Sequence, residues 1–372
     1  MASRLASALL CALLIASCGA ESDDEPIILR NSNGMEVHLL RTGACVQRLL
    51  VPDSAGDTVD VMMGFDDAES YRNGTSVSGC IIGRYGGRIT GGKFSLDGKD
   101  YQLETGKDGN TLHGGGIGYS KREWELAAVS PGTANGTNDS WAVLTLDSPD
   151  GDQNFPGNVS LEVTYTLTDA NELIIDISAV SDAATPINVF NHPYFNLAGL
   201  TSDNATILDH VLTINSDYFI ATDPETGTPT ELEPVAGSPE DFTDAHAIGE
   251  RIGEFANTIK GYQTQYLLFG TDKASEDFFG AEPAQLAATL VHPASGRALD
   301  ILTTAPTMVL YTANSLKGKF ETKGGVRPQQ YAAVALEATM LPDAGNEPAF
   351  PAPVLRPGQE YRNHVVWRFY DV

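Results

Sequence analysis

A single carboxylate interrupts an apolar run near the end of the chain. From Tyr331 to Leu341 the sequence reads YAAVALEATML, and Glu337 is the only charged residue in it. This pattern is typical of a buried strand, where a carboxylate has to be hydrogen-bonded, paired with a cation or shifted toward its neutral form. Glu337 is therefore either a structural group bound by loop amides or a general base whose pKa is tuned by burial.

A second segment places several polar side chains in an otherwise apolar stretch. Asn191, His192, Tyr194 and Asn196 fall within six residues. Histidine is the side chain best suited to deliver a proton near neutral pH, so the cluster indicates a site. The alternative for His192 is a core histidine whose hydrogen bonds are satisfied within the fold.

Two glycine-rich segments carry further candidates. In one, His113 precedes three glycines, and the segment is either part of a site or a glycine turn with an incidental histidine. The other contains Arg84 and Arg88, which would share a face in an extended chain; the alternative for both is surface charge. Neither segment follows the strand-then-helix arrangement of a phosphate-binding loop, so nucleotide binding is not expected.

The charge balance disfavours several classes of partner. The 372 residues include 23 Lys and Arg against 49 Asp and Glu, a formal net charge of −26. Nucleic-acid binders need clustered cations to displace counterions from phosphates, so no nucleic-acid partner is expected. A polyphosphate substrate is disfavoured for the same reason. The seven His and four Cys form no HExxH or CxxC motif, so we expect no metal.

The elements that must position these side chains repeat with a period of two. In the segment 160–168, Leu, Val, Tyr and Leu alternate with hydroxyl side chains or Glu. Turn residues separate similar strands, which are predicted at 35–40, 46–51, 124–129, 141–146, 173–180, 298–302, 308–312 and 364–369. Only short segments at 241–255 and 282–285 look helical. Strands without intervening helices predict an all-β fold, a large antiparallel β-sandwich formed by residues 26–372 as one domain.

The N-terminal residues predict export from the cytosol. Residues 1–20 combine one Arg, an apolar run from Leu9 to Ile15 and small residues, as a secretory signal peptide does. Cleavage before Cys18 would give a lipid-anchored protein with an acidic tether at 21–25, and cleavage beside another small residue would give simple secretion. No later apolar run is long enough to cross a membrane. Sequons for N-glycosylation occur at Asn73, Asn135, Asn138, Asn158 and Asn204.

Two cysteines, Cys45 and Cys80, belong to the predicted folded part. Outside the cytosol they could form a disulfide, and the alternative is two small buried residues in strands. The sequence does not give the distance between them, so both interpretations stay open.

The order of the motifs along the chain resembles the galactose mutarotase (aldose 1-epimerase) family. The motifs are Gly-Arg-x-x-x-Arg-Ile from Gly83, Asn-x-Leu-His-Gly-Gly from Asn110, Asn-His-x-Tyr-Phe-Asn-Leu from Asn191, and Leu-Glu-x-x-x-x-Pro-Asp-Ala-x-Asn from Leu336. The similarity extends from about Ile27 to Phe369. It implies a β-sandwich of the galactose mutarotase type that interconverts the α and β anomers of free aldoses, such as glucose or galactose, without a metal or cofactor.

The same resemblance implies roles for individual residues. Glu337 matches the general base that removes the anomeric hydroxyl proton, and His192 matches the general acid that protonates the ring oxygen. Arg88, His113 and Tyr194 match sugar-binding positions, with His113 near the ring oxygen as well.

Three positions depart from the family pattern. Gly87 stands where Asn is usual, Gln263 where an Asp binds sugar hydroxyls, and Val309 where Gln is usual. Because the acid and the base are retained while three hydroxyl contacts change, we expect an altered sugar preference or weaker binding rather than lost chemistry, with Gly87 and Gln263 still at substrate-binding positions. Two other functions remain open: a non-catalytic sugar-binding protein, and an epimerase of hexose 6-phosphates, which would need a cationic phosphate pocket.

Overall fold

The computed structural model describes residues 24–372, apart from 75, 131, 133–138, 224–227, 256–259, 269–282, 344–345, 347–349 and 351–352. The predicted signal peptide with Cys18 therefore lies outside the described residues, as do Asn135 and Asn138. Strands form most of the regular structure. The α-helices of the described part are α1 (Ala68–Asn73) and α2 (Ile248–Arg251).

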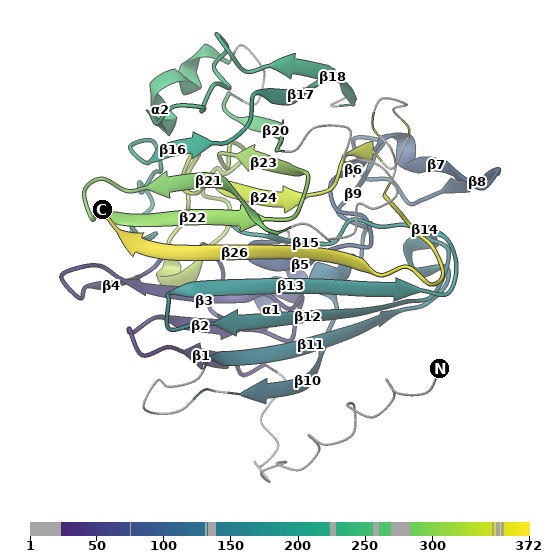
Figure 1. Cartoon of the computed structure of the whole chain (residues 1–372), viewed down its shortest axis with the longest axis horizontal. Helices are drawn as coiled ribbons and strands as arrows, with labels where there is room; N and C mark the ends of the chain where they lie inside the picture. The colour runs from purple at the N-terminus through teal and green to yellow at the C-terminus, as the bar shows by residue number, and fades with distance from the viewer. Residues whose placement is uncertain are drawn as a thin grey trace.

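The largest layer is an antiparallel sheet, in which nine strands of the described part run side by side across the molecule (Figure 1). In spatial order the strands are β10 (Glu125–Ser130), β11 (Ser140–Ser148), β12 (Val159–Leu167), β13 (Glu172–Ser181), β26 (Tyr361–Asp371), β22 (Arg297–Thr303), β21 (Gln285–Val291), β16 (Val211–Ile214) and β19 (His246–Ala247). In β12 the apolar side chains are buried and alternate with exposed or half-buried ones, which confirms the predicted alternation.

Two smaller antiparallel sheets complete the layers. A five-stranded sheet has the spatial order β18 (Pro229–Pro234), β17 (Tyr218–Thr222), β20 (Gln263–Leu267), β23 (Thr307–Tyr311), β24 (Ala335–Thr339). A four-stranded sheet contains β1 (Ile27–Arg30), β2 (Glu36–Leu39), β3 (Val46–Pro52) and β4 (Thr58–Asp60). Short strand pairs connect them: β5 (Cys80–Ile82) with β15 (Phe190–His192), β6 (Arg88–Ile89) with β9 (Thr111–Leu112), β7 (Lys93–Leu96) with β8 (Lys99–Gln102), and β14 (Thr185–Pro186) with β25 (Val354–Leu355).

The main hydrophobic core joins these sheets. It contains Val163 and Trp367 from the nine-stranded sheet, Leu310 and Leu336 from the five-stranded sheet, and Leu49 from the four-stranded sheet. Burying such a side chain fully stabilises a fold by roughly 1.5–3 kcal/mol. The shared core confirms the predicted all-β sandwich.

The helix predictions had mixed outcomes. Helix α2 lies within the predicted segment 241–255, but no prediction covered α1, where the Asp67 side chain accepts a hydrogen bond from the Ser70 N–H. The helix expected at 282–285 is wrong within the described part, because Gln285 begins β21 and pairs with Thr303. Pairing with a neighbouring strand overrides the local preference there. Among the described residues, no helix is both long and apolar enough to span a bilayer.

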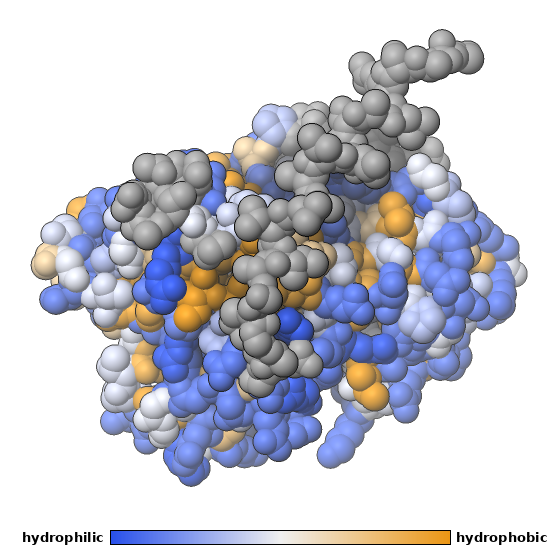
Figure 2. Space-filling model, turned by 90° about the horizontal axis from the view of Figure 1, so that it is seen from below, coloured by the Kyte–Doolittle hydropathy of each residue, from blue (hydrophilic) through white to orange (hydrophobic). Residues whose placement is uncertain are grey.

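On the face shown in Figure 2, hydrophilic residues predominate and hydrophobic ones occur in patches.

Candidate active site

A pocket of about 560 Å³ opens beside the five-stranded sheet. Its lining comes from β6, β9, β15 and every strand of the five-stranded sheet, so segments far apart in the sequence meet there. All seven residues that the sequence predicted for the site line this pocket: Gly87, Arg88, His113, His192, Tyr194, Gln263 and Glu337.

Glu337 reaches the pocket from the middle of β24, the edge strand of its sheet. The register places Glu337 opposite Val309 on β23, Val309 opposite Gln265 on β20, and Gln265 opposite Ile220 on β17. All four side chains line the pocket. This row therefore forms the floor of the pocket, with the carboxyl group at its end.

His192 is held by a short pair of strands. It is the last residue of β15, opposite Cys80 on β5. Its carbonyl accepts a hydrogen bond from the Gly79 N–H at 2.7 Å, and the Asn191 side chain donates to the Gly79 carbonyl at 2.7 Å. These bonds fix the backbone on both sides of the His192 ring.

The Glu337 carboxyl and the His192 imidazole form a buried pair. Glu337 Oε1 lies 3.3 Å from His192 Nε2, and both residues are at most 5% exposed. Burial raises the pKa of Glu337 to about 8. Burial, followed by the charge of nearby His113, lowers the pKa of His192 well below 6.5, although the backbone of His192 and Pro193 opposes this shift. Both shifts favour the neutral forms, so near neutral pH the single proton of the pair lies on Glu337.

His113 presents a defined tautomer. Its Nδ1 accepts a hydrogen bond from the Gly87 N–H at 3.2 Å, so the proton of the neutral ring lies on Nε2. Burial, and to a lesser degree the Arg88 charge, lowers the pKa of His113 to about 4. The ring lies 5.3 Å from the His192 ring, centroid to centroid. The following Gly114 cannot be replaced freely, because a Cβ there would lie 2.0 Å from the Gly83 carbonyl oxygen.

Arg88 and Tyr194 complete the polar lining. Arg88 Nη2 lies 3.5 Å from Asp108 Oδ2, and its buried Nε has no hydrogen-bond partner among the described residues. The Tyr194 ring stacks on the His192 ring at 4.9 Å, and burial together with the nearby Glu337 raises the pKa of Tyr194 well above 10. Its hydroxyl is therefore neutral and can donate to a ligand.

Arg84 has a different place from Arg88, and the surface-charge alternative is wrong for it. The side chain is 2% exposed and donates to the Pro156 carbonyl at 2.6 Å and to the Ser148 hydroxyl at 2.8 Å. Arg84 is thus a structural cation in the interior. Among the described residues that line the pocket, Arg88 is the only Lys or Arg, which does not make a phosphate pocket.

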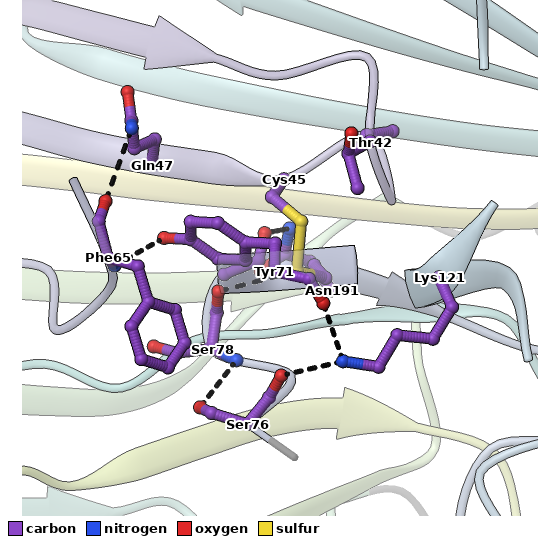
Figure 3. Close-up of a disulfide and its surroundings, with 12 residues drawn as sticks. Thr42, Cys45, Gln47, Phe65, Tyr71, Ser76, Ser78, Lys121 and Asn191 are labelled. Carbon is purple, nitrogen blue, oxygen red and sulfur yellow. Dashed lines mark hydrogen bonds between the residues drawn. A yellow bond between two sulfur atoms is a disulfide. The ribbon is translucent and has the colours of Figure 1, made fainter. Parts of the chain in front are cut away.

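The sequence analysis missed other polar residues of the lining, including Gln265, Asn188 and Ser76. Gln265 could have been found, because it lies two residues from Gln263 and hence on the same face of β20. Nothing in the sequence around Ser76 marks it as a pocket residue. Ser76 reaches the pocket because the ammonium of the half-buried Lys121 donates to the Ser76 carbonyl at 3.3 Å and to the Tyr71 carbonyl at 2.6 Å (Figure 3).

A disulfide lies next to the His192 strand. Cys45 and Cys80 are bonded, which decides between the two interpretations of these cysteines (Figure 3). The Val46 N–H donates to the Gly79 carbonyl, so hydrogen bonds flank the disulfide. In the part of the chain that the structure describes, no group of three His, Cys, Asp or Glu side chains could hold a metal ion.

The fold and the pocket together define a β-sandwich protein with a buried carboxylate–imidazole pair in a small-molecule site. The aldose 1-epimerase family model matches residues 25–368, and the chain belongs to this family. Galactose mutarotase from Homo sapiens is 36% identical over 342 residues, which is 92% of each chain, and aldose 1-epimerase from Escherichia coli is 34% identical, covering 92% of this chain and 94% of the relative.

Solved structures agree with the sequence relatives. An aldose epimerase homologue from C. elegans superposes with a TM-score of 0.82 at 27% identity, covering 94% of this chain and 99% of the other. Galactose 1-epimerase from Lactobacillus acidophilus superposes with a TM-score of 0.76 at 28% identity, covering 93% and 94%. The β-sandwich is therefore of the galactose mutarotase type.

Proposed function

We propose that the pocket interconverts the α and β anomers of free hexoses such as glucose or galactose, with Glu337 and His192 as the catalytic pair. The observation that carries this proposal is the 3.3 Å contact between the two buried groups, which together hold one proton. Opening a hemiacetal needs one group to remove a proton and another to supply one. A pair with a single proton meets both needs.

The reaction proceeds by ring opening and closure. Glu337 takes the proton of the anomeric hydroxyl while His192 gives a proton to the ring oxygen. The bond between the anomeric carbon and the ring oxygen breaks, its electron pair stays on that oxygen, and a carbonyl forms at the anomeric carbon. Rotation about the adjacent carbon–carbon bond exposes the other face, and the same two transfers in reverse close the ring. Each positioned proton transfer typically contributes about 10²–10⁴-fold.

These roles require the shared proton on His192, whereas burial places it on Glu337 in the empty pocket. The two arrangements contain the same number of protons, so changing one into the other leaves the total charge of the pocket unchanged. The sugar favours the required arrangement, because a donated hydroxyl hydrogen bond stabilises the Glu337 carboxylate and the ring oxygen accepts from protonated His192.

The other polar residues bind and orient the sugar in this proposal. Arg88 and the Nε2–H of His113 donate hydrogen bonds to sugar oxygens, and the Tyr194 hydroxyl does the same. Gln263 is exposed on β20, opposite Tyr311, and contacts a hydroxyl at the mouth of the pocket. At Gly87 the Asn side chain usual in the family is missing, and the backbone N–H of Gly87 donates to His113 Nδ1.

Polarimetry of freshly dissolved α-D-glucose and α-D-galactose tests the proposal. The protein should accelerate the approach to the equilibrium rotation, and Glu337→Gln and His192→Ala should each lower kcat by at least about 100-fold. Circular dichroism checks that the variants are folded. Folded variants with near-normal rates would exclude the pair as acid and base, and a wild type that binds sugar without turnover would favour the sugar-binding alternative.

We also propose that the protein acts outside the cytosol, either secreted or anchored through Cys18. The signal-like segment 1–20 supports this, and so does the Cys45–Cys80 disulfide, because disulfides persist mainly in oxidising compartments. Mass spectrometry of the mature N-terminus tests it. A diacylglyceryl Cys18 supports the anchor, a free N-terminus near Ala20 supports secretion, and an intact Met1 on cytosolic protein contradicts both.

A further inference from the structure

The residue Gln265 occupies the floor of the pocket without a role in the chemistry proposed above. It is half-buried on β20 and lies on the same face as Gln263. Its position in the register is between Ile220 and Val309, which are both apolar. It is therefore the polar member of the floor closest to Glu337 along this row.

The hydrogen bonds of the Gln265 amide fix its orientation. Nε2 donates to the Met340 carbonyl at 3.0 Å and to Thr307 Oγ1 at 2.8 Å. A carbonyl can only accept, so the NH₂ end of the amide has to face Met340. The Thr307 hydroxyl gives its own hydrogen to the Thr339 carbonyl at 2.8 Å, so toward Gln265 it acts as an acceptor. Both amide hydrogens are thus engaged by the protein.

The carbonyl end of Gln265 is left for a ligand. Oε1 accepts no hydrogen bond from the described residues, and the side chain lines the pocket. Because the NH₂ end is held from two sides, the amide cannot turn over to present a donor. The pocket floor therefore offers a fixed acceptor at this point.

The register also gives the separation of Gln265 and Glu337 across the sheet. Neighbouring strands lie about 4.8 Å apart, so the Cα atoms of Gln265 and Glu337 are separated by about 10 Å with Val309 between them. A hexose whose anomeric hydroxyl contacts Glu337 is long enough to reach across Val309 to Gln265. The side chain of Val309 gives an apolar surface for ring carbons and no hydrogen bond, so the next polar contact on this row is the Gln265 carbonyl.

We propose that the Gln265 carbonyl oxygen accepts a hydrogen bond from one non-anomeric hydroxyl of the sugar and thereby determines which hexoses bind well. The inference rests on the proposed function. A sugar that lacks this hydroxyl leaves a polar group of the pocket unpaired, which is the physical basis of discrimination against it. Gln265 is a specificity residue and takes no part in the proton transfers.

The test compares wild type with Gln265→Met, which keeps the length of the side chain and removes its polar atoms. Both are assayed on glucose and on a panel of monodeoxy glucoses, each lacking one non-anomeric hydroxyl. For wild type, the deoxy sugar that lacks the hydroxyl bound by Gln265 should have a kcat/KM about 3- to 10-fold lower than glucose. Gln265→Met should lower kcat/KM for glucose by the same factor, mainly through KM, and should leave that one deoxy sugar unaffected. Deoxy sugars that lose contacts with other residues should respond to Gln265→Met as glucose does, so only this one sugar should respond differently.

A purely structural role of Gln265 would give a different result. Gln265→Met would then weaken every sugar by the same factor, and this outcome, or no change for any sugar, would overturn the proposal. Gln285→Met is the matched control, because Gln285 is exposed on β21 outside the pocket. If Gln265→Met does not fold, Gln265→Asn keeps an amide but withdraws the carbonyl, and it should give the same loss of discrimination.

A failure of the proposed function can be told apart from a failure of this inference. If wild type turns over no aldose, the proposed function fails, and calorimetric binding of the same sugars to wild type and Gln265→Met then decides the role of Gln265. Selective loss of one hydroxyl contact would support it, and equal or absent binding of all the sugars would overturn it.

Discussion

Replacing Glu337 by Gln should remove a contribution that lowers the stability of the wild type as the pH rises from 6.5 to 8. Folding raises the pKa of Glu337 from its ordinary 4.5 to about 8 because the carboxyl group is buried. The folded state binds its proton in a pH range where the unfolded chain does not. This contribution to stability is therefore fully present below pH 4.5 and is lost as the pH rises through 8.

Three buried histidines act in the opposite direction at lower pH. The pKa of His192 lies well below 6.5, and burial lowers the pKa of His113 and that of His210 to about 4. Below pH 6.5 these residues are protonated in the unfolded chain before they are protonated in the fold, so stability falls as the pH falls. As the pH rises above 6.5 the unfolded chain loses these protons within about one pH unit. The same three histidines are present in the wild type and in Glu337→Gln, so their contribution cancels when the two proteins are compared.

The size of the effect follows from one proton and the width of the window. A proton that only the folded state binds lowers the free energy of unfolding by about 1.4 kcal/mol for each pH unit of increase. The window from pH 6.5 to the Glu337 pKa of about 8 spans about 1.5 units, which gives a loss of about 2 kcal/mol.

Urea unfolding at pH 6.5 and pH 8, followed by tryptophan fluorescence, measures this loss. Between the two pH values the wild type should lose about 2 kcal/mol relative to Glu337→Gln, because only the wild type carries the Glu337 proton. Glu162→Gln is the matched control, because Glu162 is exposed on β12, and it should behave as the wild type does. An equal loss in Glu337→Gln and in the wild type would refute the assignment of a raised pKa to Glu337.

Three further measurements follow from the site. A plot of kcat/KM against pH should be bell-shaped. The value should fall above about pH 8, where the Glu337–His192 pair loses its proton, and well below pH 6.5, where the pair gains a second proton. A flat profile from about pH 4 to 9 would contradict the assignment of this pair as acid and base. Gln263→Asp should lower KM for glucose or galactose about 5- to 30-fold, with kcat within a few-fold, because a charged acceptor binds hydroxyls more strongly. If the wild type has almost no kcat and the substitution restores it, the wild type has instead lost its catalytic geometry. Replacing both Cys45 and Cys80 by Ala should lower the free energy of unfolding by about 4 kcal/mol, because the disulfide closes a loop with a sequence separation of 35. Urea unfolding measures this change, and an unchanged midpoint would show that the disulfide adds no stability.

The sequence by itself determined the class of the fold and the residues that carry the chemistry. The alternation in β12 predicted its strand, because a side-chain period of two leaves one face to bury. Glu337 stood out because it is the only charge in an apolar run, and burial of a lone carboxylate demands an explanation that local structure alone does not give. The polar cluster around His192 stood out for the same reason.

Only the tertiary structure decided which of two similar residues belongs to the site. Arg84 and Arg88 lie four positions apart in one glycine-rich segment, yet Arg84 is buried among carbonyls and Arg88 lines the pocket. The pairing of Cys45 with Cys80 and the place of Gln265 on the floor were likewise fixed by the fold.

The physical reason is that these outcomes depend on contacts between residues distant in sequence. Strand register places Val309 between Gln265 and Glu337, and a shift of one residue would turn each of these side chains to the opposite face of the sheet. The proton of the catalytic pair depends on such contacts as well. Glu337 and His192 come from strands 145 positions apart and meet at 3.3 Å only in the folded chain, where burial raises the pKa of one and lowers that of the other.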